Sequence, residues 1–160
     1  MRLFSCVIAA LAGTAFAAPS SIEQRQVNSN HGTIVTPTSG SSLLSGGTFD
    51  FKYIQSDWCH DGYSPVDVYL TSFAPTAANL NSAGGFSEGD YTYFFGSFLA
   101  ANFGLPVITP AVPTSLTLPA LNGISAGSQL FLAVVETARS CPPGNVPPQY
   151  GLTSTAIVYG

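Results

Sequence analysis

Apolar and polar residues alternate with a period of two in several short segments, which is typical of β-strands with one buried face. In residues 47–54 three aromatic side chains share one phase of the alternation, and the polar residues occupy the other. In residues 65–73 the phase expected to face inward comprises Val66, Val68 and Leu70. The opposite phase, expected to point outward into solvent, comprises Asp67, Tyr69 and Thr71.

Five further segments complete the predicted set of about seven strands. Residues 127–136 are apolar in both phases, as in a central strand that is covered on both faces. Pro37 confines the first strand to a sheet edge, and Gly96 indicates a bulge. The remaining predicted strands lie in residues 33–37, 90–99, 114–119 and 152–159, with a loop and one helical turn in residues 74–89. No amphipathic helix is evident, so the pattern predicts an all-β, immunoglobulin-like β-sandwich.

The first 30 residues are expected to lie outside this domain. Residues 1–17 have the basic start, short apolar run and small-x-small end of a signal peptide, which predicts a secreted, extracellular protein. Residues 18–30 are polar and lack periodicity, so we expect a flexible segment or a short propeptide that a protease could trim after Arg25. Residues 31–160 then form one domain.

Cysteine usage predicts one disulfide. Cys6 leaves with the signal peptide, so Cys59 and Cys141 are the remaining pair in an oxidising compartment. They lie in the loops between the second and third strands and between the last two strands, which emerge at the same end of such a sandwich. The bond should therefore join two loops and should not join the two sheets.

Composition excludes several classes of protein. Only 8% of residues are charged while 46% are hydrophobic, which excludes a disordered chain. Eight acidic residues outnumber four basic ones, and the basic residues form no patch, so nucleic acid and membrane surfaces are not expected partners. No apolar stretch beyond the signal peptide approaches the length of a membrane span.

The stretch 57–63, DWCHDGY, concentrates chemistry that the chain otherwise avoids. If Cys59 is oxidised, only Asp57, His60 and Asp61 remain as metal ligands, with no second cluster elsewhere, so no metal or cofactor is expected. A polar loop beside a disulfide is the simpler interpretation.

Catalytic patterns are equally sparse. No G-x-S-x-G motif occurs, and the carboxylate pairs Asp57/Asp61 and Glu88/Asp90 each lie within one loop, so we do not expect an enzyme. One alternative stays open. Residues 31–37, HGTIVTP, resemble the start of copper-dependent polysaccharide monooxygenases, in which an N-terminal histidine chelates copper; His31 with His60 would need a protease to expose His31.

Aromatic residues suggest a binding surface. Tyr and Trp combine apolar area with a polar group, so a set of them could stack on sugars or contact a partner protein, or could equally belong to the core. Tyr91 and Tyr93 are open to both interpretations. The candidate binding surface comprises Trp58, His60, Tyr63 and Tyr150.

Two secreted fungal families resemble this chain. Ile34, Pro37, Gly40 and residues 46–48 are similar to the opening of the immunoglobulin-like domain in fungal cell-wall proteins related to β-1,6-glucan assembly factors. That resemblance implies a module that binds cell-wall polysaccharide or another glycan.

The second resemblance covers nearly the whole mature chain and is to the necrosis-inducing secreted effectors of fungi. It rests on residues 47–49, 53–56, 67–68, 96–98 and the last strand through Tyr159. It implies a non-enzymatic virulence effector that binds a host protein, namely immune receptor-associated kinases of plants, and either enters host cells or remains at the cell wall. The segment 57–65 and the Cys59/Cys141 pair depart from that family's pattern.

Overall fold

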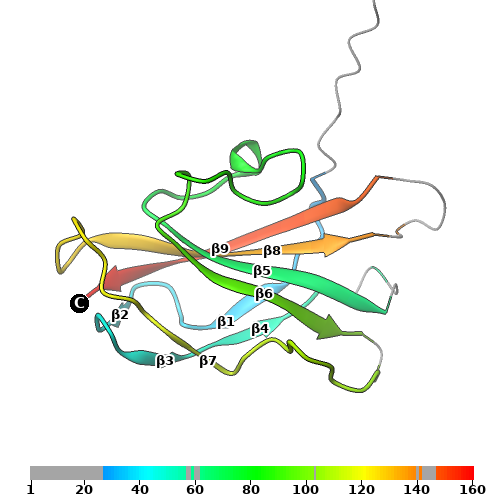
Figure 1. The fold of residues 1–160 in the computed structure, drawn as a ribbon, viewed down its shortest axis with the longest axis horizontal. Helices are drawn as coiled ribbons and strands as arrows, with labels where there is room; N and C mark the ends of the chain where they lie inside the picture. The colour runs from blue at the N-terminus through cyan, green and yellow to red at the C-terminus, as the bar shows by residue number, and fades with distance from the viewer. Residues whose placement is uncertain (1–26, 57–58, 60–61, 103, 140, 142–146) are drawn as a thin grey trace, which may run out of the picture.

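The computed structural model describes residues 27–56, 59, 62–102, 104–139, 141 and 147–160. These residues form an all-β structure with one short 3-10 helix, η1, at Ala77–Asn79. The nine strands are β1 (Thr33–Thr36), β2 (Ser41–Leu43), β3 (Thr48–Asp50), β4 (Lys52–Ile54), β5 (Tyr63–Thr71), β6 (Tyr93–Ala101), β7 (Ser115–Thr117), β8 (Gln129–Ala138) and β9 (Gln149–Tyr159) (Figure 1). Within the described ranges, no helix has the length and apolar character that crossing a membrane requires.

The larger layer is a five-stranded sheet with the strand order β2-β9-β8-β5-β6. Its neighbours pair antiparallel, except that β2 runs parallel to the end of β9. The smaller layer consists of two pairs, β1 with β4 and β3 with β7. β3 and β4 follow each other directly and are separated only at Phe51, whose N–H donates to Thr114 O at 2.9 Å.

The alternation predicted most of these strands, and the differences have local causes. β2 was not predicted because Ser41 and Ser42 lie between turn residues and carry little strand signal. The predicted strand over residues 47–54 appears as β3 and β4 because of the break at Phe51. The bulge expected at Gly96 is present: Val68 pairs with Gly96 but Tyr69 pairs with Phe94, and Gly96 has φ 137°.

The main core lies between the two layers. Phe51 and Leu116 of the smaller layer pack with Val66, Val68 and Leu132 of the larger sheet. A second cluster continues this interior toward the C-terminal end of β9, around Leu70, Leu118 and Ile157. The phase predicted to face inward in β5 therefore does so.

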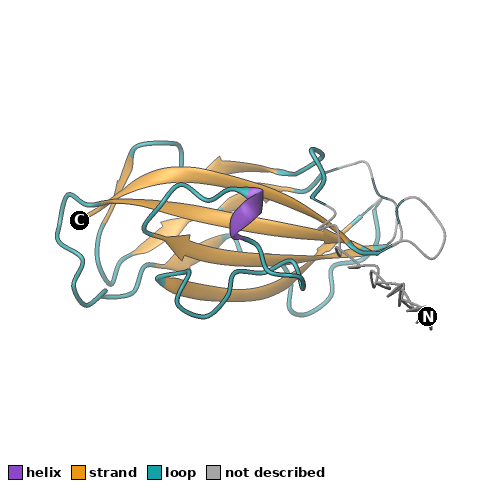
Figure 2. Cartoon of the chain, turned by 90° about the horizontal axis from the view of Figure 1, so that it is seen from above, coloured by secondary structure: helices purple, strands orange, loops and turns teal. Residues whose placement is uncertain are grey.

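The outward face of the larger sheet is also covered over part of its area. Residues 72–92, which include η1, fold back over it, and Leu80 and Phe86 pack on Tyr69 and Val135 (Figures 1 and 2). Tyr69 and Thr71 are consequently buried, with exposed fractions of 7% and 0%. The prediction that these two side chains point into solvent was wrong, because the alternation fixes the face of a residue but cannot show that a distant loop covers that face.

The domain begins before the predicted boundary at residue 31. Val27 pairs with Tyr150, and Asn28 N donates to Tyr150 O at 2.9 Å. Asn28 Nδ2 also donates to Gln149 Oε1 at 2.7 Å. The last residues of the segment predicted to be flexible thus lie along the start of β9; residues 1–26, including the predicted signal peptide, lie outside the described residues.

Candidate functional site

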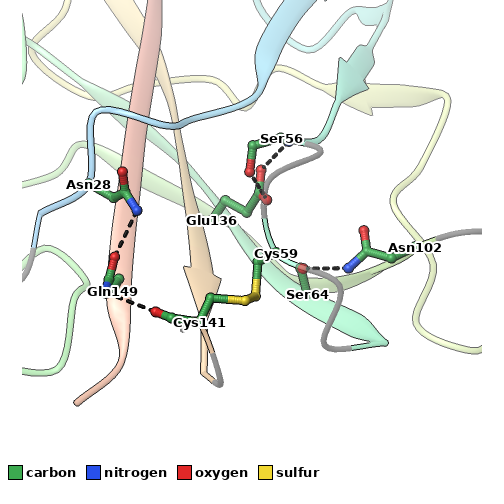
Figure 3. Close-up of a disulfide and its surroundings, with 8 residues drawn as sticks. All are labelled: Asn28, Ser56, Cys59, Ser64, Asn102, Glu136, Cys141 and Gln149. Atoms are coloured by element: carbon green, nitrogen blue, oxygen red, sulfur yellow. Dashed lines mark hydrogen bonds between the residues drawn. A yellow bond between two sulfur atoms is a disulfide. The ribbon is translucent and has the colours of Figure 1, made fainter. Parts of the chain in front are cut away.

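A disulfide between Cys59 and Cys141 organises one end of the molecule (Figure 3). The two Cα atoms are 5.6 Å apart, and the sequence separation is 82 residues. Both cysteines are buried, and they pack on Ala138 in a cluster apart from the interlayer core. Since Cys59 follows β4 and Cys141 follows β8, the bond joins two loops, as the sequence predicted.

A buried carboxylate lies next to this disulfide. Glu136, on β8, has an exposed fraction of 4% and occupies the phase that faces the smaller layer. Its Oε2 accepts hydrogen bonds from Tyr53 Oη at 2.6 Å and Ser56 N at 2.9 Å. Its Oε1 accepts one from Ser56 Oγ at 2.6 Å, and Figure 3 shows the contacts between Glu136 and Ser56. Three donors therefore compensate the burial of this charge and fix the start of the loop that carries Cys59.

Tyr53 is held in its neutral form by this arrangement. Burial, followed by the negative charge of Glu136 and the hydrogen bond to it, raises the pKa of the Tyr53 phenol well above its ordinary value. The same oxygen accepts a hydrogen bond from Gly32 N at 3.1 Å, which links β4 to the residue before β1. Sequence reasoning did not single out Glu136; the available signal was a carboxylate in the inward phase of an otherwise apolar strand.

Two more polar contacts position the neighbouring loop ends. Asn102 Nδ2 donates to Ser64 Oγ at 3.0 Å, and both residues have an exposed fraction of 2%. Gln149 Nε2 donates to Cys141 O at 2.9 Å while its Oε1 accepts from Asn28 (Figure 3). Side chains from four segments therefore form hydrogen bonds near the disulfide.

Of the predicted binding surface, the structure describes Tyr63 and Tyr150 and places them on different strands. Tyr63 is half-buried at the start of β5, and its hydroxyl donates to Pro106 O at 2.8 Å. Tyr150 lies on β9 with an exposed fraction of 8%, packed against the loop over the outward face. β8 separates the strands of these two residues, and Trp58 and His60 lie outside the described residues.

Tyr91 and Tyr93 have different environments. Tyr91 packs against Tyr69 with ring centroids 5.4 Å apart and belongs to the cluster on the outward face. Tyr93, at the start of β6, has an exposed fraction of 39% and makes an edge contact with Phe95. The sequence left open whether these two tyrosines pack in the protein or are exposed for binding. Tyr91 is packed, and Tyr93 is exposed.

An open groove of about 410 Å³ lies on the uncovered part of the outward face. Its floor follows neighbouring positions on four strands. Leu99 pairs with Pro65, and Thr137 pairs with Tyr150. Pro65 and Thr137 each lie next to one member of the cross-strand pair Val66 and Glu136. The complete lining is Pro65, Asp67, Ala83, Ser97, Phe98, Leu99, Pro110, Thr137, Arg139, Pro148 and Tyr150. The groove therefore spans β6, β5, β8 and β9 and is bounded by residues of three loops.

Asp67 gives this groove a negative charge. The side chain is half-buried on the floor, directly opposite Ser97 on β6 and Val135 on β8. Among the described residues, no hydrogen bond or ion pair to its carboxylate is present. Burial raises the pKa of the adjacent Tyr69 phenol to about 12, with a further contribution from the charge of Asp67. Asp67 thus lies on the outward phase of β5, as the sequence predicted, and is only partly exposed to solvent.

The other residues considered for chemistry are not gathered in the described structure. Across the described ranges, no group of three or more His, Cys, Asp or Glu side chains could hold a metal ion. His31 is exposed, and its Nδ1 lies 2.9 Å from Gly32 O. Asp57, His60 and Asp61, the potential ligands in the Cys59 loop, lie outside the described residues.

Fold and site together define an all-β, sandwich-like protein with a loop-to-loop disulfide and a groove on the outward face of its larger sheet. Comparison with protein-family models, with curated proteins and with solved structures found no match to this chain.

Proposed function

We propose that this protein is a secreted, non-enzymatic recognition module of the immunoglobulin-like type, which binds a partner protein through the groove on its five-stranded sheet. The observation that carries the proposal is the groove itself. It crosses four strands whose inward side is a packed core and whose ends are fixed by a disulfide and buried hydrogen bonds. Binding sites built on such a rigid support lose little conformational entropy when a partner binds.

The strand arrangement supports the immunoglobulin-like assignment. In such domains strands C, F and G share one sheet, variable-type domains add C′ beside C, and strands A, B and E lie in the other sheet. β5, β8 and β9, with β6 next to β5, correspond to the first set, and β1, β3/β4 and β7 correspond to the second. The position of the disulfide differs, because the usual bond joins strands B and F whereas Cys59 and Cys141 join the loops that follow the corresponding strands.

The resemblance to secreted fungal effectors suggests the kind of partner. This resemblance implies that the partner is a host protein, and plant immune receptor-associated kinases are the first candidates to test. A mixed lining of prolines, Leu99, Tyr150, two hydroxyl groups and two charged side chains suits a polypeptide surface, because protein interfaces combine an apolar centre with dispersed polar contacts.

Groove-dependent binding of purified kinase domains tests this proposal. Ser97 is an exposed groove residue on β6, so Ser97→Trp should fill the groove without disturbing the core. Ser115→Trp is the matched control, since Ser115 is an exposed strand residue of the opposite layer. We expect Ser97→Trp to reduce binding at least about tenfold and Ser115→Trp to leave it unchanged. Equal binding by both variants would exclude the groove as the contact surface.

A glycan-binding module is the second candidate, and the hydroxyls of Ser97 and Thr137 beside Asp67 favour it. Hydroxyl and carboxylate groups next to Tyr150 could bind sugar hydroxyls. Co-sedimentation with insoluble β-glucan, compared between the same two variants, separates this candidate from the first.

A further inference from the structure

We propose that the groove accepts an extended segment of the partner protein whose lysine or arginine side chain places its cation on the Asp67 carboxylate. This inference depends on the proposed recognition function and specifies its ligand. Four observations on the described residues carry it: the unpaired carboxylate, the apolar walls, the width of the groove and the charge of the protein.

The carboxylate of Asp67 lacks the partners that other shielded polar groups in this protein have. Its nearest neighbours in the sheet register, Ser97 and Val135, are uncharged, and no donor to its oxygens is present in the described part of the chain. Glu136 shows the contrast, since three donors surround that buried carboxylate. A half-buried carboxylate without a donor gains most from a charge-assisted hydrogen bond to a cation.

The walls suit the aliphatic part of a long basic side chain. Pro65, Pro110 and Pro148 contribute apolar surface and are conformationally stiff, and Leu99 lies on the floor beside Pro65. Lysine and arginine bury their methylene groups on such surfaces while the charged group reaches a polar partner. A small inorganic cation would leave these walls without a contact.

The width of the groove suits a short extended segment. Its floor crosses β6, β5, β8 and β9, and three inter-strand spacings of about 4.8 Å make roughly 14 Å. About four residues of extended chain cover that distance. The hydroxyl of Ser97, opposite Asp67, and that of Thr137, two residues beyond Val135 on β8, are available to backbone groups of such a segment.

The net negative charge of the protein favours a cationic ligand group at Asp67. The formal net charge of the chain is −4, so its overall field attracts basic segments. Asp67 lies on the floor of the groove, so the ligand should carry its basic side chain at its centre.

Paired peptide libraries test this inference. The probes are capped heptapeptides with arginine fixed at the centre and the other positions randomised, and a matched library with citrulline, its neutral analogue. Selected peptides are then measured singly by fluorescence anisotropy against the wild-type protein, Asp67→Asn and Asp50→Asn. Asp50 is exposed on β3 of the other layer, so its variant has the same change in net charge.

We expect arginine peptides to bind about tenfold more weakly to Asp67→Asn than to the wild type, with Asp50→Asn unchanged. Citrulline peptides should bind weakly to all three proteins. Four results would overturn the inference. The arginine and citrulline peptides could bind equally well, or Asp67→Asn and Asp50→Asn could lose the same affinity for the arginine peptides. Arginine methyl amide could bind as tightly as the arginine peptides, or β-glucan oligosaccharides could bind more tightly than they do. Kinase binding that is lost in Ser97→Trp but retained in Asp67→Asn would leave the proposed function intact and refute only the role of the cation.

Discussion

At the scale of single residues, the hydrogen bond between Tyr53 and Glu136 should make a measurable contribution to stability. Tyr53→Phe removes one of three donors to a buried carboxylate and also leaves Gly32 N without its acceptor. Hydrogen bonds to charged groups contribute about 1.5–3 kcal/mol, so we expect the free energy of unfolding to fall by about that amount. Urea denaturation provides the measurement.

Tyr93→Phe is the matched control for that variant. The Tyr93 hydroxyl is exposed and has no hydrogen-bond partner among the described residues, so its removal should change stability by less than about 0.5 kcal/mol. If both variants lose the same stability, the hydrogen bond from Tyr53 to Glu136 does not stabilise the fold.

The ionisation of Tyr69 reports on Asp67 at the same scale. The pKa of Tyr69 is raised to about 12, first by burial and then by the Asp67 charge, so Asp67→Asn should lower the pKa while leaving it above the ordinary value of about 10. Tyrosine-selective NMR during a pH titration measures this value. An unchanged pKa of Tyr69 in Asp67→Asn would show that the carboxylate does not face this part of the sheet.

The sign of the accompanying pH dependence follows from the same shift. Because the pKa of Tyr69 is higher in the folded than in the unfolded chain, its contribution to stability is complete below pH about 10 and is lost as the pH rises toward about 12. Tyr53, whose pKa is also raised, acts in the same direction. We therefore expect the wild type to lose stability steeply above pH 10, and Asp67→Asn to lose less over that interval. Stability that rises with pH there would contradict the account.

At the scale of elements, the loop over residues 72–92 depends on a close contact between Gly84 and Tyr150. A Cβ at Gly84 would lie 1.9 Å from Cε1 of the Tyr150 ring, and the residue has φ +85°. Gly89 has a similar φ of +93° but nothing within 4 Å, so Gly89→Ala shares the backbone strain without the clash. We expect Gly84→Ala to be less stable than Gly89→Ala by about 1–3 kcal/mol in thermal or urea unfolding. Equal stability of the two variants would mean that the loop is not packed on Tyr150.

The same element marks the limit of what the sequence predicts. Alternation located β4 and β5, and an apolar run in both phases located β8. Cysteine usage correctly paired Cys59 with Cys141, and their positions in the sequence correctly predicted a bond between two loops. The groove depends on segments 72–92 and 104–114, whose positions over the sheet follow from tertiary packing and not from any local period. Tyr150, which the sequence placed on a candidate binding surface, is buried because the loop over residues 72–92 packs on it.

At the scale of the whole molecule, the disulfide should stabilise the domain without being required for its core. Closing a loop of this length contributes about 4–5 kcal/mol in the chain-entropy model. The interlayer clusters contain neither cysteine. The double variant Cys59→Ser/Cys141→Ser should therefore keep its β-type circular dichroism at low temperature while its urea midpoint falls. A loss below about 1 kcal/mol, or wild-type protein that is unaffected by a reductant, would contradict this prediction.

The central claim is that the outward face of the five-stranded sheet, and not the opposite layer, binds the partner. Amide chemical-shift mapping of the isotope-labelled protein, titrated with the tightest arginine peptide, tests it most directly. We predict that the largest shifts fall on Asp67, Ser97, Leu99 and Thr137, while Asp50 and Ser115 of the smaller layer stay unchanged. Shifts confined to the smaller layer, or to the exposed apolar side chains Leu105, Val107 and Ile108 with the groove unaffected, would contradict the account.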